Sequence, residues 1–212
     1  MLGINYTIFY LTQVNNSKLG LDTNYETLSY SFLFPEPSFN EKILNNKMYT
    51  ILDMPGYMSI GRKAGKPVLP VKYVKLLLPP RKKVIDISIV GTPVEIKTEN
   101  VKLVDKPVFP HQTPTPIGSR HPKEINFDEE LYRSQSVYLS MPKEDQQIGY
   151  CRGYTVLSLA INPVQYVPGK GRLFYYPEMT LNIKLGESDY MSKFFRYSLD
   201  NEKWIKTLVS NP

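Results

Sequence analysis

The only thiol and imidazole side chains in this 212-residue sequence are one cysteine and two histidines. A nucleophilic cysteine needs a base within hydrogen-bond reach and a third group that orients the base. Cys151 lies in a strand-like stretch, whereas His111 and His121 lie in a proline-rich segment far away in sequence. This separation favours a buried structural cysteine, and we expect no catalytic residues in the chain.

The same residues do not make a metal site. Structural zinc takes four ligands, usually in closely spaced pairs, and His111 and His121 are not accompanied by such a set. Residues 61–66 resemble a phosphate-binding loop, but one residue is missing between the glycines and Pro67 replaces the Ser or Thr that would hold magnesium. We therefore expect neither a metal nor another cofactor, and a single cysteine excludes an internal disulfide.

The formal charge is +6, from 26 Lys and Arg against 20 Asp and Glu. The basic residues cluster at 62–66, 81–83 and 170–172, all of them predicted turns. Nucleic-acid sites interleave such charges with stacking aromatics, and here the aromatics belong mainly to strands. We interpret the clusters as solvated turns and expect no nucleic-acid partner, with polyanion binding kept as a third hypothesis.

Short strands separated by turns are the elements that must position any site. Proline and tyrosine are abundant, which disfavours helices and favours half-buried strands. Residues 179–185 alternate between apolar and polar side chains, and 168–171 have the turn chemistry of a hairpin. The predicted strands are 6–12, 27–34, 49–54, 71–78, 84–90, 153–161, 165–167, 172–176 and 179–185.

These elements predict an all-β fold, a single β-sandwich or jelly-roll-like domain with a short C-terminal helix at 200–209. Residues 128–133 are expected to form one helical turn. The proline-rich segment 106–122 shows no periodicity and is predicted to be an extended, ordered and exposed loop. No apolar run approaches the ~18 residues of a membrane span, and the first residues do not look like a secretion signal.

Two proline-punctuated blocks are more specific than composition. The first is Gly65-Lys66-Pro67-Val68-Leu69-Pro70 with the apolar runs that follow it, and the second runs from 156 through Pro163-Val164-Gln165-Tyr166-Val167-Pro168 to 185. In this order they resemble the gingipain-type propeptide family, the N-terminal prodomains of caspase-like cysteine peptidases. The similarity covers roughly residues 49–185.

The resemblance implies a non-catalytic, all-β prodomain that assists the folding of a cognate gingipain-like cysteine peptidase and keeps it latent until proteolytic removal. In gingipains, a prodomain arginine enters the specificity pocket of an Arg-specific enzyme, where a guanidinium can pair with a carboxylate. Here the residues implied for this blocking role are Arg120 first and Lys123 second. Pro122 would stiffen the loop against productive cleavage.

The resemblance also implies a division of the chain. Residues 1–48 would add N-terminal strands to a propeptide-like core at 49–187, and 188–212 would be a linker with a short helix toward a peptidase domain that the sequence lacks. Cleavage in that linker would occur after a basic residue, and the candidates are Lys193, Arg196, Lys203 and Lys206. By the same resemblance the protein is expected to be secreted or extracellular.

A function of another class stays open on the residues alone. Tyr166, Tyr175 and Tyr176 could present an aromatic platform, as carbohydrate-binding sites do. The alternative is therefore a stand-alone adhesive or carbohydrate-binding β-sandwich.

Overall fold

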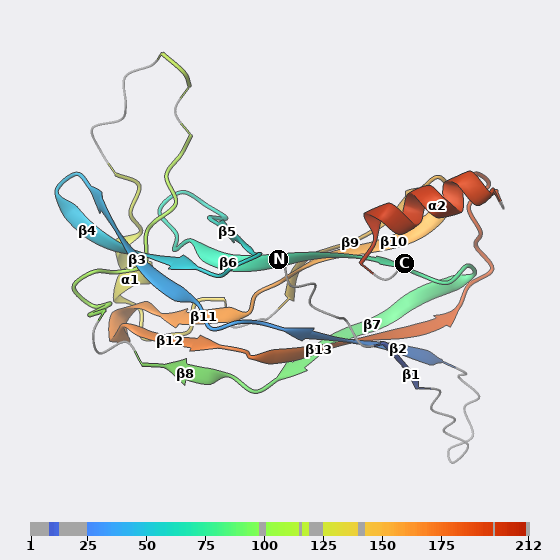
Figure 1. Ribbon diagram of the computed structural model, residues 1–212, viewed down its shortest axis with the longest axis horizontal. Coiled ribbons are helices and arrows are strands. Elements are labelled where there is room, and N and C mark those ends of the chain that lie inside the picture. The colour runs from blue at the N-terminus through green and yellow to red at the C-terminus, as the bar shows by residue number, and fades with distance from the viewer. Residues whose placement is uncertain are drawn as a thin grey trace.

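The molecule is built mainly of antiparallel strands that run along one long axis (Figure 1). The computed structural model describes residues 9–12, 25–97, 101–114, 116–118, 125–139, 143–196 and 198–210. Two four-stranded sheets form the two layers of a sandwich, and smaller sheets extend one end of it. The predicted all-β sandwich is confirmed.

The first sheet has β13 at its centre, between β2 and β7. The predicted alternation in β13 is confirmed, because Met179, Leu181, Ile183 and Leu185 are buried while the residues between them face outward. On the outer face, the Ser29 hydroxyl donates to Asn182 Oδ1 over 2.7 Å. The strands in spatial order are β1 (Phe9–Thr12), β2 (Glu26–Leu33), β13 (Glu178–Glu187) and β7 (Lys82–Gly91).

The second sheet covers the inner face of the first. Leu157, Leu159 and Ile161 of its strand β10 are almost fully buried in the core that the two layers share. Its edge strand β9 was not predicted, because Lys143–Cys151 is polar and forms a strand only by pairing with β10. The order is β5 (Met58–Ile60), β6 (Leu69–Leu77), β10 (Tyr154–Ile161) and β9 (Lys143–Cys151).

Smaller elements make up the end of the molecule on the left of Figure 1. One is the hairpin of β3 (Ser38–Leu44) and β4 (Lys47–Asp53). Another is the sheet of β11 (Val164–Val167), β12 (Arg172–Tyr175) and β8 (Val94–Ile96). The predicted hairpin turn between β11 and β12 is confirmed and contains the 3-10 helix η1 (Pro168–Lys170).

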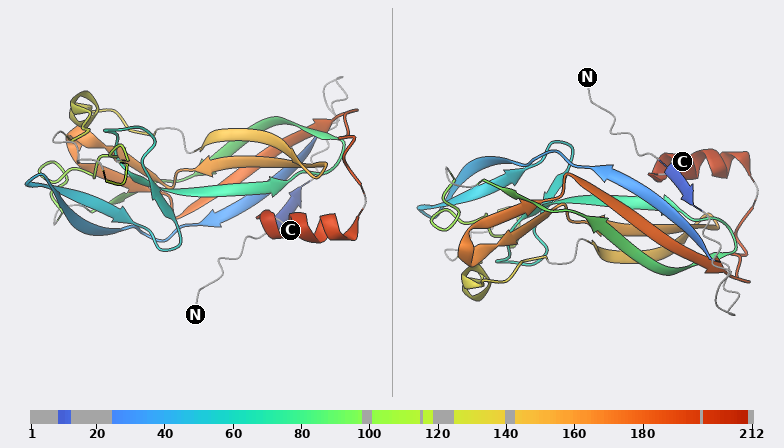
Figure 2. Two further views of the ribbon diagram at one scale, coloured as in Figure 1. Left: turned by 90° about the horizontal axis from the view of Figure 1, so that it is seen from above. Right: turned by 90° about the horizontal axis from the view of Figure 1, so that it is seen from below.

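Two α-helices complete the structure. The predicted helical turn is α1 (Glu129–Arg133), and the predicted C-terminal helix is α2 (Leu199–Leu208). Figure 2 shows α2 outside the sandwich, at the end opposite the β3–β4 hairpin. Neither helix is long and apolar enough, within the part of the chain that is described, to cross a membrane.

Candidate functional site

The proline-rich segment begins as part of the core, contrary to the prediction of an exposed loop. Thr50 of β4 donates its backbone N–H to Pro107 O over 2.9 Å and accepts from Phe109 N over 2.8 Å. Phe109 O in turn accepts from Val68 N over 3.0 Å, and the buried Thr50 hydroxyl donates to Lys106 O. The segment is therefore held as an added strand between β4 and residues 65–68.

Gly65 joins the two ends of the loop that follows. Its N–H donates to His111 O over 2.8 Å, and its carbonyl accepts from Asp128 N over 3.2 Å. Its φ of +81° favours glycine, and a Cβ there would lie 3.1 Å from the Asp128 nitrogen. Lys66 beside it pairs with Asp128 at 2.5 Å. The Gly-x-Pro-x-Leu-Pro element thus closes the base of the loop.

Asp128 is fixed by two kinds of contact. Its carboxylate accepts from the Lys66 ammonium and, as the N-cap of α1, from the Leu131 amide over 2.9 Å. These hydrogen bonds, first from Lys66 and then from Leu131, hold the pKa of the Asp128 carboxyl below its ordinary value. The loop has two legs, the segments by which the chain enters and leaves it. The second leg therefore continues directly into the anchored helix α1.

A second set of hydrogen bonds, here called the clamp, joins the two legs of the loop next to the contacts of Gly65. The Gln112 side-chain amide donates to Pro110 O and to Asn126 O, each over 2.9 Å, and its oxygen accepts from Asn126 N over 3.0 Å. The Asn126 side chain adds a 3.2 Å bond to the Thr113 hydroxyl. The two legs are therefore joined at residues 112 and 126, which closes the base of the segment between them.

The described part of this loop stands clear of the body at the top left of Figure 1. Pro114 and Pro116 restrict its backbone, and the Ile117 side chain is fully exposed. Gly118 follows with φ of +85°. Arg120 and Lys123, predicted as blocking residues, and His121 lie outside the described residues.

Two stacked aromatic rings, one buried and one partly buried, support the base of the loop. Phe127 stacks on Tyr132 with ring centres 4.2 Å apart, and the Tyr132 hydroxyl donates to Val108 O over 2.6 Å. Burial raises the pKa of Tyr132 far above its ordinary value and raises that of Tyr166 to about 12. Both phenols therefore stay neutral. Tyr132 acts as a packing and hydrogen-bonding group, and the buried Tyr166 contributes by packing.

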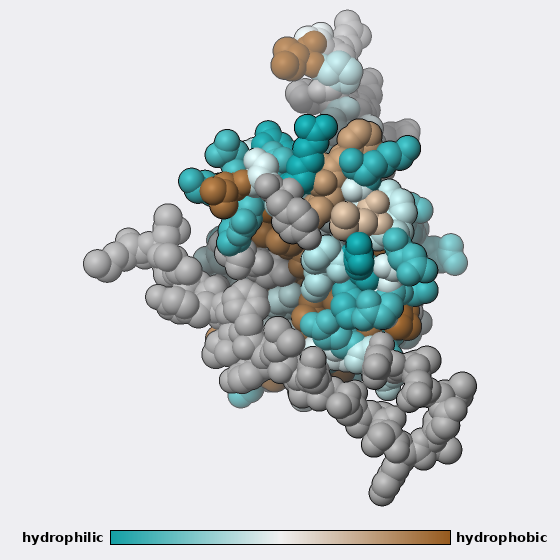
Figure 3. Space-filling model, turned by 90° about the vertical axis from the view of Figure 1, so that its right-hand side faces the viewer, coloured by the Kyte–Doolittle hydropathy of each residue, from teal (hydrophilic) through white to brown (hydrophobic). Residues whose placement is uncertain are grey.

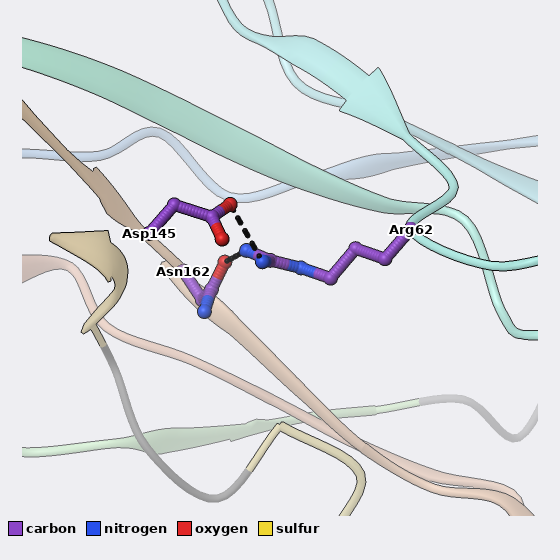
Figure 4. A network of polar contacts seen from close by, with 3 residues as sticks. All are labelled: Arg62, Asp145 and Asn162. Carbon is purple, nitrogen blue, oxygen red and sulfur yellow. Dashed lines mark hydrogen bonds and ion pairs between the residues drawn. The ribbon is translucent and has the colours of Figure 1, made fainter. Parts of the chain in front are cut away.

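The basic clusters predicted to be solvated turns are in part structural. Figure 4 shows Arg62 reaching Asp145 of β9 and Asn162 at the end of β10, with bonds of 3.1 and 3.0 Å. Asp145 has φ of +52° and lies where the β9–β10 register shifts, as in a β-bulge. The Arg62 side chain is only 20% exposed, so this part of the prediction was wrong.

The other two clusters also contain paired charges. Lys82 binds Glu187 at 2.6 Å, and Arg172 binds both oxygens of Glu95 at 2.6 and 2.7 Å. Each cation is thus balanced by a carboxylate from a neighbouring strand. This pairing weakens the case for a polyanion-binding groove.

The sulfur and imidazole groups are not brought together as a reactive centre among the described residues. Cys151 ends β9 and lines a hollow beneath α2 with Ile205, whereas His111 packs against Gly61 at the base of the loop. In the described ranges no three His, Cys, Asp or Glu side chains form a potential metal site.

The four predicted processing residues fall into two groups. Lys193 and Arg196 are exposed in the segment before α2. Lys203 and Lys206 lie within α2, where Lys206 pairs with Glu202 at 3.0 Å. Sequence alone did not distinguish between the groups.

Comparisons with known proteins agree with this architecture. A family model described as Propeptide_C25 matches residues 21–194. No curated protein is significantly similar in sequence. A structure from work on the zymogenic latency of gingipain K from Porphyromonas gingivalis is 17% identical, with a TM-score of 0.64, covering 88% of this chain and 97% of that one. The complex of Porphyromonas gingivalis RgpB pro- and mature domains gives 13% identity and a TM-score of 0.65, covering 96% of each chain.

Proposed function

The chain belongs to the Propeptide_C25 family, and we propose that it keeps a gingipain-like cysteine peptidase latent by placing the loop 112–126 in the active site. The observation that supports this mechanism best is the double closure of that loop at its base, by Gly65 and by Gln112 with Asn126. A loop that is already closed loses less conformational entropy on binding.

In this proposal the loop would present a substrate-like residue to the peptidase without allowing productive cleavage. Arg120 is the first candidate for the specificity pocket and Lys123 the second, since both lie between the clamped positions. An arginine matches a carboxylate through two parallel hydrogen bonds. Because both legs are anchored, the backbone would resist the adjustment that attack on the next peptide bond requires.

The partner is a cognate gingipain-like cysteine peptidase domain. The solved RgpB structure is a complex of pro- and mature domains, and this chain is similar in fold to one chain of that complex. We further propose that the chain assists the folding of its peptidase and is secreted with it, as the family relationship favours.

The carbohydrate-binding alternative requires exposed tyrosine rings on one surface. Tyr166 is completely buried and Tyr176 is only 8% exposed. Both rings are buried in the hydrophobic core, so they cannot form a surface that contacts a sugar. Of the three tyrosines predicted for that platform, Tyr166 and Tyr176 are core residues and Tyr175 is half-buried.

The test is inhibition of the mature cognate peptidase by the purified protein. We expect slow, tight inhibition, and Arg120→Ala to raise the inhibition constant at least tenfold, about 1.4 kcal/mol. Lys123→Ala tests the second candidate, and Lys63→Ala, an exposed charge outside the loop, is the control. A folded chain that does not inhibit refutes the function, and an unchanged constant for Arg120→Ala removes only that residue.

A further inference from the structure

The segment that follows β13 folds back along the sandwich and is anchored at several points. Ser188 N donates to Arg81 O over 2.9 Å, and Ser192 is buried. Phe195 packs edge-on against Tyr154 with ring centres 4.9 Å apart. A Cβ on Gly153 would lie 2.3 Å from the Phe195 backbone, so the contact is close.

The helix at the end of this segment is docked on the outer face of the second sheet. Ile205 is completely buried there, and Ser210 N donates to Lys75 O of β6 over 2.7 Å. The Arg152 guanidinium lies 4.0 Å from the Trp204 ring centre and donates to Asn201 Oδ1 over 3.1 Å. Thus α2 is part of the folded unit and not a free linker.

Between these anchors one short turn is exposed. Phe195 N donates to Ser192 O over 2.9 Å, which leaves Lys193 and Phe194 as the two central residues of the turn. Both are exposed, and the Phe194 side chain is 72% exposed. Figure 3 shows the end of the molecule that carries this segment, where hydrophobic side chains lie among hydrophilic ones.

Arg196 is placed differently. Its carbonyl accepts from Ser198 N over 2.8 Å, next to the start of α2.

A peptidase must bind its substrate in an extended form, so a bond in an anchored helix is cut only after local unfolding. Exposed turn tips are the usual sites of proteolytic nicking.

We propose that the processing bond for a peptidase specific for basic residues is Lys193–Phe194, and that docking of α2 protects Lys203 and Lys206. The propeptide match also ends at residue 194. The biological purpose of the cut rests on the proposed function, but the order of the cuts does not. It is set by the fold of the isolated chain.

Limited digestion of the whole chain with trypsin, followed by mass spectrometry, tests this inference. The C-terminal products 194–212, 197–212, 204–212 and 207–212 report the four bonds separately, whatever is cut elsewhere. We expect 194–212 to form first, and direct cuts after Lys203 and Lys206 in the intact chain to be at least about tenfold slower. Equal initial rates at the four bonds would overturn the proposal.

Two alanine variants of α2 separate docking from helix content. Ile205→Ala removes the buried anchor, and Leu199→Ala removes a side chain that is 74% exposed on the same helix. We expect Ile205→Ala to accelerate the cuts at Lys203 and Lys206 at least tenfold, about the effect of a 1.4 kcal/mol change in opening. Leu199→Ala should leave them unchanged.

A variant outside the helix guards against general unfolding. Arg152→Ala removes the contacts with Trp204 and Asn201, and it should also accelerate the cuts in α2 while the thermal unfolding of the sandwich stays cooperative. Lys193→Gln should abolish the 194–212 product without raising the rate at Lys203. If both docking variants leave α2 as resistant as the native chain, docking does not protect it and the inference is wrong.

Discussion

Replacing Gln112 by alanine tests whether the hydrogen bonds that close the loop contribute to inhibition of the peptidase. The substitution removes two bonds donated by the side-chain amide and one that its oxygen accepts from Asn126 N. Each hydrogen bond contributes about 0.5–1.5 kcal/mol net, and water replaces part of it at this half-buried site, so we expect a loss of about 2 kcal/mol. Most of the loss falls on loop closure, because two of the three bonds join Gln112 to Asn126 across the loop, whereas the bond to Pro110 O lies within one leg.

Two measurements separate the clamp from its function. Hydrogen exchange at the Asn126 amide should accelerate in Gln112→Ala, because its acceptor is gone. The inhibition constant against the cognate peptidase should rise about 30-fold, the equivalent of about 2 kcal/mol. Gln146→Ala, an exposed glutamine on β9, is the matched control and should change neither.

The possible results lead to different conclusions. If the Asn126 amide exchanges faster and the inhibition constant stays the same, the clamp exists but loop bracing does not contribute to latency. If exchange at Asn126 does not change, the hydrogen bonds assigned to Gln112 are wrong. Only the joint change supports the reasoning.

Three further substitutions test neighbouring features. Gly65→Ala should lower the free energy of unfolding by about 1–3 kcal/mol, measured by urea denaturation, because φ is +81° and the new Cβ meets the Asp128 backbone. Ile117→Ser should leave the melting temperature unchanged but weaken inhibition about 10- to 100-fold if the exposed side chain becomes buried in the partner. Asp128→Asn should flatten the pH dependence of stability. The lowered pKa of Asp128 contributes stability above about pH 4 that is lost as the pH falls through the folded-state pKa, and an unaltered acid titration would refute this assignment.

The strands with local signals could be predicted from the sequence. The alternation in β13 and the Pro-Gly turn between β11 and β12 depend on residues close together in the chain, and both are found. Strand β9 depends instead on pairing with β10, since Glu144, Asp145 and Gln146 have low strand propensity. The residues of β9 alone do not indicate this pairing.

The hydrogen bonds that close the base of the loop could not be predicted from the sequence. Gln112 and Asn126 are polar residues in a proline-rich stretch, and nothing local marks them as partners. Arg62 reaches residues 83 and 100 positions away, so its cluster was interpreted as solvated. Arg120 and Lys123 depend on family resemblance alone and stay a prediction.

The two proposed elements lie at opposite ends of the long axis. The described part of the loop 112–126 lies at the end with the β3–β4 hairpin, and the segment between β13 and α2 lies at the end that carries α2 (Figures 1 and 2). A cut at Lys193–Phe194 breaks none of the hydrogen bonds that close the loop, which all lie between Thr50 and Asp128. Processing at that bond should therefore leave the blocking loop intact, so that loss of latency requires dissociation of the prodomain or a second cut in the loop itself.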